Sequence, residues 1–338
     1  MTEFRMHGAN PEKTYAFFSV PMPEKVYDFS TNTNVLPWDG ELNIDVHKAM
    51  SEYPDDDSKE LCDIIAEENN CHPDNVLVTN GSNEAIYLIA SYQKSKQNCV
   101  IHPVYGEYNR ALKAYDVLHR NVRSPLFIEK SDETVWICNP NNPTGKYLPE
   151  DEMLGLFEFY KNTVFVIDEA YRDFLYEGRW NLDVNDNSKM IILRSLTKNF
   201  HLCGARIGYV LACTATIKAL KERQPTWSVN AVAQQAALVY LSDKGYLQKT
   251  AEFYKKEVPR FIGELISLGY EVTPSKVNFF LVKTDDDEKL IKFLLRRGIV
   301  VRHTRNFIGL DGKYIRVATR SVDENNIFIK AMKEFSLI

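Results

Sequence analysis

Short apolar segments alternate with helical patterns along most of the chain, and this alternation limits the fold more than any other feature. Residues 57–70 carry apolar side chains at helical spacing, and residues 76–79 form an apolar run that leads into a second helical pattern. Further apolar runs follow at 99–102, 134–138, 164–168, 190–195 and 207–212. Short strands that are apolar on both faces and alternate with helices are typical of a mainly parallel sheet covered on both sides. The sequence therefore predicts an α/β fold.

The last third of the chain predicts a second, smaller unit. It contains a long helical pattern, then a strand, a helix and two more strands, at 244–268, 279–283, 288–297, 299–302 and 314–318. The first 30 residues include three prolines and predict an extended arm. We therefore predict an N-terminal arm that joins the small domain, a large domain and a small α+β C-terminal domain, at residues 1–30, 31–250 and 251–338.

Composition argues against several classes of partner. The net charge of −5 at pH 7 disfavours a nucleic-acid or anionic-membrane partner. No run approaches the roughly 20 apolar residues that a membrane helix needs, and the N-terminus lacks the apolar core of a signal peptide. The six cysteines form no C-x-x-C pair, which fits reduced thiols better than disulfides or a metal site. We expect a cytoplasmic protein without a metal.

Polar residues follow four of the predicted strands, at the sheet edge where open α/β folds bind ligands. The first segment turns from a strand into a helix, and the free N–H groups of a helix N-terminus can hold a phosphate. Gly81 would let the backbone approach that phosphate, and Ser82 and Asn83 would add donors. An ordinary capped turn would use the same residue types, so this segment alone leaves both interpretations open.

Two further segments carry amide and carboxylate groups. Residues 138–145 contain two prolines and three asparagines, among which Asn142 can bond a phenolate oxygen or a carboxylate. Residues 164–171 form a buried strand that ends in Asp168, with Tyr171 three residues later. An unpaired buried carboxylate is costly, so Asp168 needs a cation, which a protonated pyridine nitrogen or a salt bridge could supply.

The fourth segment contains Ser195, Thr197 and Lys198, and Arg206 follows shortly after it. A lysine in an apolar, cation-rich pocket can supply the neutral amine that forms a Schiff base, although a surface lysine is the alternative. Ser195, Thr197 and Arg206 would complete a phosphate site. Together the four segments provide a phosphate site, an amide, a carboxylate and an amine. Pyridoxal phosphate has the four groups that these would bind.

The order and spacing of Gly81, Asn142, Asp168, Lys198 and Arg206 closely resemble the fold-type I pyridoxal-phosphate enzymes of the class I/II aminotransferase superfamily. The resemblance extends over essentially the whole chain. It implies a mainly parallel seven-stranded sheet between helices in the large domain, and a small α+β C-terminal domain. It also implies pyridoxal 5′-phosphate as the cofactor, joined to Lys198 and paired at its ring nitrogen with Asp168.

The same resemblance implies further roles. Asn142 and Tyr171 would bond the ring hydroxyl, and Tyr105 would stack on the ring face. Lys198, Asp168 and Tyr171 would form the catalytic group. Tyr53 matches a tyrosine that in this family reaches the cofactor phosphate of the neighbouring subunit. This match implies a homodimer with shared active sites.

Two subfamilies share these motifs. The sequences at 138–145, 168–171 and 194–198 resemble histidinol-phosphate aminotransferases. Other segments, which in these enzymes contact the substrate rather than the cofactor, resemble threonine-phosphate decarboxylases of cobalamin synthesis. They are residues 6–8, 28–32, 224–231 and 301–318. The chain departs from the decarboxylase pattern at three places. Ala9 stands where a second glycine is usual, residues 32–35 read N-T-N-V where N-I-N-P is usual, and Tyr171 stands where phenylalanine is common.

Both subfamilies act on amino compounds that carry a phosphate, so the expected partner is a small amino-acid phosphate. Arg302 and Arg316 are candidates to hold substrate phosphate and carboxylate, in either order. His7, Gly8 and Asn32 would close the substrate side of the pocket. We predict decarboxylation of L-threonine O-3-phosphate, or a close analogue, to an amino-alcohol phosphate. The alternative is a histidinol-phosphate type aminotransferase with 2-oxoglutarate as acceptor, and a non-catalytic ligand-binding module is a third hypothesis.

Overall fold

The chain forms one large sheet with a second group of strands beside it. The computed structural model describes residues 8–176, 178–179, 183–185 and 187–338. The large sheet has seven strands in the order β2-β8-β7-β6-β5-β3-β4, and only β8 runs antiparallel to its neighbours. The prediction of a mainly parallel seven-stranded sheet is therefore confirmed. The strands are β2 (Val76–Thr79), β3 (Asn98–Ile101), β4 (His119–Val122), β5 (Thr134–Cys138), β6 (Val164–Asp168), β7 (Met190–Ser195) and β8 (Gly208–Ala212).

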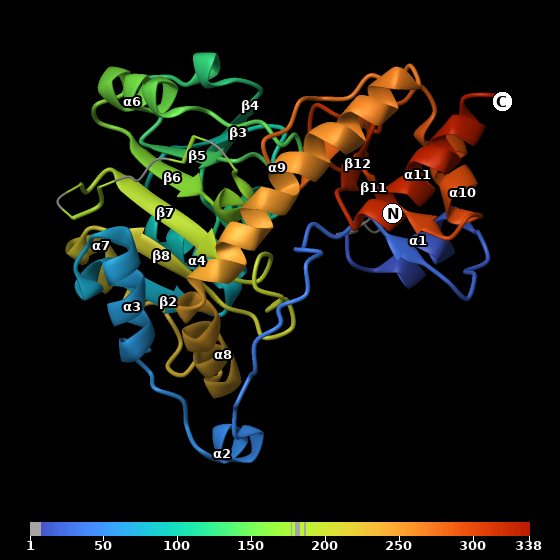
Figure 1. Ribbon diagram of the computed structural model, residues 1–338. Coiled ribbons are helices and arrows are strands. Elements are labelled where there is room, and N and C mark those ends of the chain that lie inside the picture. The colour runs from blue at the N-terminus through green and yellow to red at the C-terminus, as the bar shows by residue number, and fades with distance from the viewer. Residues whose placement is uncertain (1–7, 177, 180–182, 186) are drawn as a thin grey trace.

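Helices cover both faces of this sheet, as the apolar strands require (Figure 1). Every residue of the central strands β5, β7 and β8 is buried. One face packs against α3 (Lys59–Asn69), α6 (Glu150–Phe159) and α8 (Ala231–Ser242). The other face packs against α4 (Gly81–Tyr92), α5 (Glu107–Ala114) and α7 (Thr214–Lys221).

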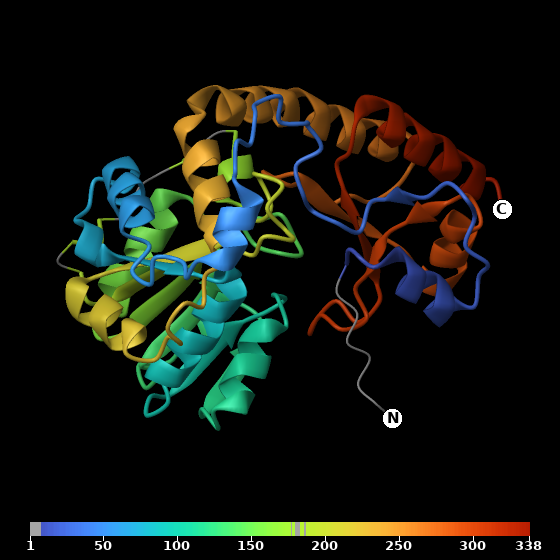
Figure 2. The same ribbon diagram turned by 90° about the horizontal axis from the view of Figure 1, so that it is seen from below.

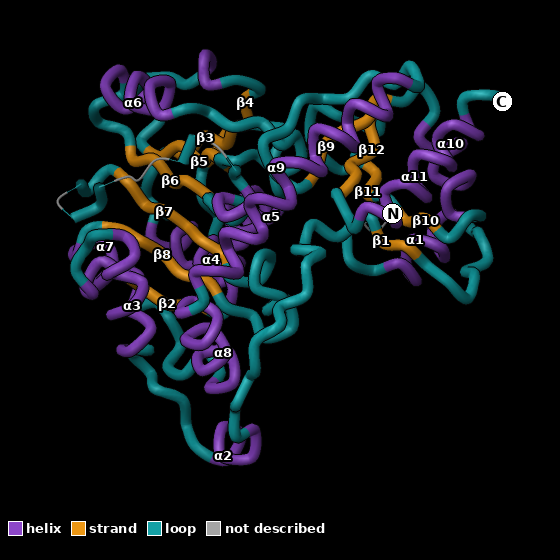
Figure 3. Tube along the Cα trace, in the orientation of Figure 1, coloured by secondary structure: helices purple, strands orange, loops and turns teal. Residues whose placement is uncertain are grey.

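The second group of strands is reached through α9 (Lys244–Ser267), which spans from the large sheet to the smaller ones (Figure 2). Figure 3 shows the strands gathered in two separate groups. One small sheet has the order β11-β12-β9, and the other pairs β1 with β10 in parallel. These elements are β1 (Tyr27–Asp28), β9 (Phe279–Lys283), β10 (Ile299–Val300), β11 (Arg302–His303), β12 (Tyr314–Ala318), α10 (Asp287–Leu295) and α11 (Val322–Phe335).

The N-terminal segment is not extended throughout, so that part of the sequence prediction was wrong. Residues Pro11–Phe18 form helix α1, whose Asn10 side chain accepts a hydrogen bond from the Lys13 amide at 3.1 Å. Tyr15 and Phe18 of α1 are buried in the same core as α10 and α11. The segment therefore packs against the C-terminal elements. The predicted domain boundaries remain predictions, and the one at 250/251 would fall inside α9.

Two other predicted elements differ from the structure. The single strand predicted at 299–302 is two strands in different sheets, because β10 pairs with β1 and β11 pairs with β12. The helix predicted at 57–70 begins at Lys59, because the Asp55 carboxylate accepts a hydrogen bond from the Lys59 amide at 2.7 Å.

Among the described residues, no helix combines the length and the apolar character needed to cross a bilayer.

Candidate active site

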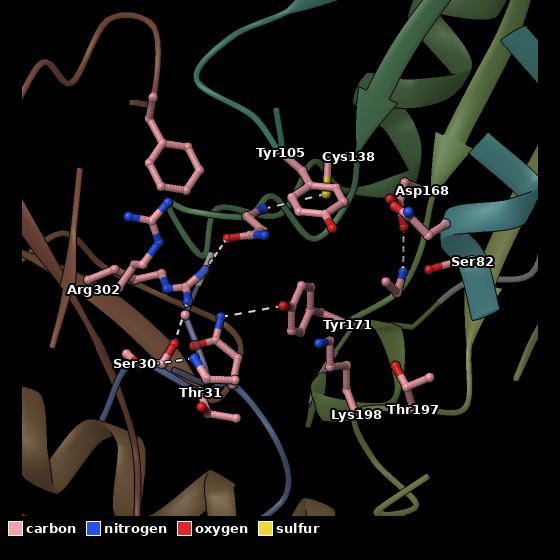
Figure 4. Close-up of a pocket in the computed structure, with 18 of the residues that line it drawn as sticks. Ser30, Thr31, Ser82, Tyr105, Cys138, Asp168, Tyr171, Thr197, Lys198 and Arg302 are labelled. Atoms are coloured by element: carbon pink, nitrogen blue, oxygen red, sulfur yellow. Dashed lines mark hydrogen bonds between the residues drawn. The ribbon is translucent and has the colours of Figure 1, made fainter. Parts of the chain in front are cut away.

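Residues from distant parts of the chain meet in one cavity between the large sheet and the β11-β12-β9 sheet. Figure 4 shows Asp168 and Ser82 on one side of this cavity and Arg302 on the opposite side. The structure brings most of the predicted site residues to its wall: Gly8, Asn32, Ser82, Asn83, Tyr105, Asn142, Asp168, Tyr171, Thr197, Lys198, Arg206, Arg302 and Arg316.

Three predicted residues that the structure describes do not line the cavity. Gly81 and Ser195 stand directly behind its wall, next to Arg206 and Thr197 respectively. Tyr53 lies elsewhere: its side chain is 80% exposed and its ring is 4.5 Å from that of Trp227. His7 falls outside the residues that the structure describes.

The side chains that the sequence predicts to bind a phosphate gather where α4 begins. Gly81 is the first residue of α4 and has a positive φ of 74°, which glycine adopts without strain. A Cβ atom built on Gly81 would lie 2.6 Å from Nη2 of Arg206, so the missing side chain makes room for the guanidinium. Ser195 and Thr197 share a hydrogen bond of 2.7 Å between their hydroxyls. This corner thus combines a helix N-terminus, hydroxyls and an arginine, as an anion site requires.

Replacing Gly81 with alanine tests this corner. If this corner holds the phosphate of the cofactor that the sequence predicts, binding of that cofactor should weaken by roughly ten-fold or more, because the new methyl group displaces the Arg206 guanidinium and forces a strained φ. Equilibrium dialysis with pyridoxal 5′-phosphate measures the change. The matched control is Gly155→Ala in α6, where an added Cβ meets no atom within 4 Å and affinity should stay constant. Equal affinities of both variants would contradict the assignment.

Asp168 ends β6 as a buried carboxylate. Its Oδ2 accepts a hydrogen bond from the Tyr108 hydroxyl at 2.5 Å, and its Oδ1 accepts one from the Ala170 amide at 2.9 Å. Within the described part of the chain, no arginine or lysine forms an ion pair with it. Burial raises the pKa of Asp168, and the two hydrogen bonds oppose this by lowering it. Among the described residues, the salt bridge that the sequence left open as a partner for Asp168 is therefore not present.

Lys198 projects into the cavity from the loop after β7 (Figure 4). Its backbone carbonyl accepts a hydrogen bond from the Asn34 amide at 2.9 Å, which fixes the loop against the segment after β1. Tyr171 and Tyr105 also line the cavity, and the Tyr171 hydroxyl accepts a hydrogen bond from the Asn32 amide group at 3.4 Å. A lysine amine therefore shares one space with two phenols and a buried carboxylate.

Two buried arginines form the opposite wall. Arg302 of β11 and Arg316 of β12 are directly opposite each other in the strand register. Arg316 donates to the Asn142 side-chain oxygen at 2.6 Å and to the Ser30 carbonyl at 2.8 Å. Arg302 donates to the His303 carbonyl at 2.7 Å and to Asn306 Oδ1 at 2.8 Å. Neither guanidinium forms an ion pair with a carboxylate among the residues described.

This wall is electrostatically unfavourable without a bound anion. Burial, and secondarily repulsion from Arg316, lowers the pKa of Arg302 to about 9. Burial also lowers the pKa of Arg316. Buried cations without counter-charges are costly, so an anionic ligand is the natural partner of the pair.

The sequence analysis assigned no individual site role to six wall residues, namely Ala9, Ser30, Thr31, Cys138, Ala170 and Phe307. Ser30, Thr31 and Phe307 lie in the segments 28–32 and 301–318, where substrate was expected. The Asp28 carboxylate organises two of them, accepting hydrogen bonds from the Ser30 and Thr31 hydroxyls at 2.6 Å. The sequence also did not indicate the hydrogen bond between Tyr108 and Asp168. No local spacing indicated this bond, because Tyr105 lies before α5, Tyr108 lies within it, and Asp168 belongs to a distant strand.

A family model described as aminotransferase class I and II matches residues 25–332. The chain belongs to this family. It is 32% identical to a histidinol-phosphate aminotransferase from Thermoanaerobacter pseudethanolicus over 96% of both chains. It is 30% identical to a threonine-phosphate decarboxylase from Salmonella typhimurium over 97% of this chain and 95% of the other.

Solved structures of the same two kinds of enzyme share the fold of this chain. The L-threonine-O-3-phosphate decarboxylase from Porphyromonas gingivalis superposes with a TM-score of 0.82 at 27% identity, covering 91% of this chain and 100% of that one. The histidinol-phosphate aminotransferase from Sinorhizobium meliloti, solved with pyridoxal-5′-phosphate, shares the fold with a TM-score of 0.82 at 18% identity, covering 100% and 98%. The predicted fold type and family are confirmed.

As a member of this family, the chain is a pyridoxal 5′-phosphate-dependent enzyme. The side chains fit this cofactor. Gly81 and Arg206 form a corner suited to a phosphate, Asp168 is a buried carboxylate that no lysine or arginine of the described residues pairs with, and Lys198 supplies an amine. The predicted cofactor is therefore confirmed, whereas the roles of individual residues remain proposals.

Proposed function

We propose that this enzyme decarboxylates L-threonine O-3-phosphate, or a close analogue, to an amino-alcohol phosphate. The observation that carries the proposal is the pair Arg302 and Arg316. Residues directly opposite each other on antiparallel strands have Cβ atoms about 5 Å apart, so both guanidiniums can reach one anionic group. A phosphate monoester carries up to two negative charges and accepts forked donors. A closely spaced pair therefore suits a single phosphate better than two anions at opposite ends of a substrate.

The cofactor side of the cavity would work as follows. When bound, pyridoxal 5′-phosphate draws electrons from a bond to the substrate Cα. Asp168 would pair with the ring nitrogen, and Asn142 and Tyr171 would donate to the ring hydroxyl oxygen. Ser82, Asn83, Thr197 and Arg206, supported by Gly81 and Ser195, would hold the cofactor phosphate, and Tyr105 would cover the ring.

The position of the substrate carboxylate decides which bond breaks. If both arginines hold the substrate phosphate, neither of them holds the substrate carboxylate, which would then be the group that leaves Cα, as carbon dioxide. Lys198 then delivers a proton to Cα, which gives the amino-alcohol phosphate. Small changes in the position of the substrate carboxylate decide which bond to Cα breaks. Gly8 and Asn32, which line the same space, would close the substrate side.

Supplying L-threonine O-3-phosphate as the sole substrate tests the proposal. We expect stoichiometric release of carbon dioxide and an amino-alcohol phosphate, without formation of a keto acid and without a need for 2-oxoglutarate. Labelled carboxylate and mass spectrometry measure both products. L-threonine without the phosphate is the control and should react at least roughly 100-fold more slowly in kcat/KM, because the arginine pair then lacks its anion. Equal rates on both compounds would contradict the proposed substrate class.

The second candidate function is transamination of histidinol phosphate with 2-oxoglutarate. It is favoured by Tyr171, which is the aminotransferase-like residue at its position, and by the 32% identity with a histidinol-phosphate aminotransferase. In this function the arginines would hold the phosphate of histidinol phosphate, which has no carboxylate, and Arg316 would hold a carboxylate of 2-oxoglutarate when that acceptor binds. Lys198 would remove the Cα proton. Dependence of turnover on 2-oxoglutarate, with an imidazole substrate, would support it over decarboxylation.

We also propose that two copies of this chain share their active sites, with Tyr53 serving the partner's cofactor phosphate. The support is the segment around α2 (Val46–Ser51), which has no buried residue and projects from the body of the molecule (Figure 3). Met50 and Tyr53 are 77% and 80% exposed. A second copy would cover these side chains, and sedimentation velocity measures whether the protein is a dimer.

A further inference from the structure

Asp168 depends on one side chain that the sequence motifs did not indicate. Tyr108, in the first turn of α5, donates its hydroxyl to Asp168 Oδ2 at 2.5 Å. Both residues are buried, with exposed fractions of 1% for Tyr108 and 5% for Asp168. The other carboxylate oxygen bonds only the Ala170 amide at 2.9 Å. Tyr108 is therefore the one side chain of the described residues that bonds this carboxylate directly.

The ring of Tyr108 is held firmly. The Trp136 ring lies 5.5 Å from it, and the Tyr105 ring meets it edge-on at 6.2 Å. Trp136 is itself fixed, because its indole N–H donates to Asn98 Oδ1 at 2.9 Å. Since α5 and β6 are both packed in the same core, the phenol and the carboxylate meet in a defined geometry.

The direction of the hydrogen bond follows from charge. Burial, followed by the nearby Asp168 charge, raises the pKa of Tyr108 well above its usual range, so the phenol keeps its proton and donates it. A donated hydrogen bond stabilises the ionised form of the carboxylate against the cost of burial. The other ionisable groups near Asp168 are Cys138 of β5, Glu169, Tyr105 and Lys198. Of these, only Lys198 favours the carboxylate charge, and its effect is smaller than that of Tyr108.

We propose that Tyr108 is a positioning residue that keeps Asp168 ionised and oriented toward the cofactor ring nitrogen. Tyr108 does not line the cavity, and its hydroxyl, which Tyr108→Phe removes while keeping the ring against Tyr105, acts on the cofactor through Asp168. This inference rests on the proposed role of Asp168, but it is independent of which substrate or reaction the enzyme has.

The test compares binding of pyridoxal 5′-phosphate with binding of its 1-deaza analogue, in which carbon replaces the ring nitrogen. We expect Tyr108→Phe to weaken binding of pyridoxal 5′-phosphate by about 10- to 100-fold, the range for a hydrogen bond to a charged group. Binding of the analogue should change by less than about two-fold, since it has no ring nitrogen for Asp168 to pair with. In an Asp168→Asn background, adding Tyr108→Phe should have little further effect.

The matched control is Tyr15→Phe, which removes a buried hydroxyl that bonds the Leu295 carbonyl at 3.0 Å in the C-terminal core. It should leave both affinities unchanged. Equal weakening of both compounds by Tyr108→Phe, or no weakening of either, would overturn the inference while leaving the role of Asp168 intact. If Asp168→Asn itself fails to discriminate between the two compounds, the proposed role of Asp168 falls and the inference falls with it.

A second measurement covers the case in which Tyr108→Phe does not fold. A 3-fluorotyrosine placed at position 108 reports its own hydrogen bond through its ¹⁹F resonance. We expect this resonance to shift when pyridoxal 5′-phosphate binds and to shift much less with the 1-deaza analogue. The same shift with both compounds would contradict a role that acts through the ring nitrogen.

Discussion

The Lys198→Ala enzyme is expected to lose at least roughly 10⁴-fold in turnover and to lose covalent attachment of the cofactor. Lys198 is the lysine whose side chain enters the cavity, where it would both join the cofactor and carry the proton at Cα. Borohydride reduction followed by peptide mapping should label position 198 in the natural enzyme and no position in the variant. The control is Lys218→Ala, an exposed lysine of α7, which should retain full activity and labelling.

The same variant tests the shared active site. In a mixed dimer of Lys198→Ala and Tyr53→Ala chains, one of the two sites contains both natural residues. Tyr53→Ala alone should also lose activity, because it would remove the cofactor-phosphate contact from both sites. Unfolding and refolding the two variants together should therefore restore part of the natural activity. Activity no higher than the sum of the separate variants would contradict the contribution of Tyr53 across subunits.

Replacing Arg302 with methionine is expected to lower kcat/KM for the phosphorylated substrate by roughly 10³-fold, within the range for removing one partner of a buried charge pair. The unliganded enzyme should at the same time become more stable, by about 1–2 kcal/mol in the free energy of unfolding, because a buried cation without a counter-charge is removed. Steady-state kinetics and denaturant unfolding measure the two effects.

Arg305→Met is the matched control for this change. Arg305 lies three residues further along, is partly exposed, and pairs with Asp287 at 2.7 Å. We expect kcat/KM to stay constant and stability to fall slightly, since an ion pair is lost. An Arg302→Met enzyme that keeps its activity on the phosphorylated substrate would rule out the proposed phosphate site.

The large sheet could be predicted because its strands are local apolar runs. The strands predicted at 134–138, 164–168 and 190–195 agree with β5, β6 and β7, each of which is buried almost throughout. Strand β4 (His119–Val122) gave no such signal, because it lies at the sheet edge and two of its residues are only partly buried. The break between β10 and β11 was missed because it depends on pairing with β1, more than 270 residues away.

The cofactor side of the cavity was also visible in the sequence. Gly81 begins α4, Asp168 ends β6 and Lys198 lies in the loop after β7, and the topology of the sheet brings such positions to one edge. The contacts among these residues were not visible. The bond from Tyr108 to Asp168 spans 60 residues, so no local pattern indicates it.

The sequence by itself determined the fold class, the family and most of the predicted residues that line the cavity, because these depend on local patterns and on the order of motifs. Only the tertiary structure decided what each buried charge is paired with: a phenol for Asp168, and no carboxylate among the described residues for Arg302 and Arg316. The physical reason is that burial makes an unpaired charge costly, and which partner offsets that cost is set by contacts between segments far apart in the chain.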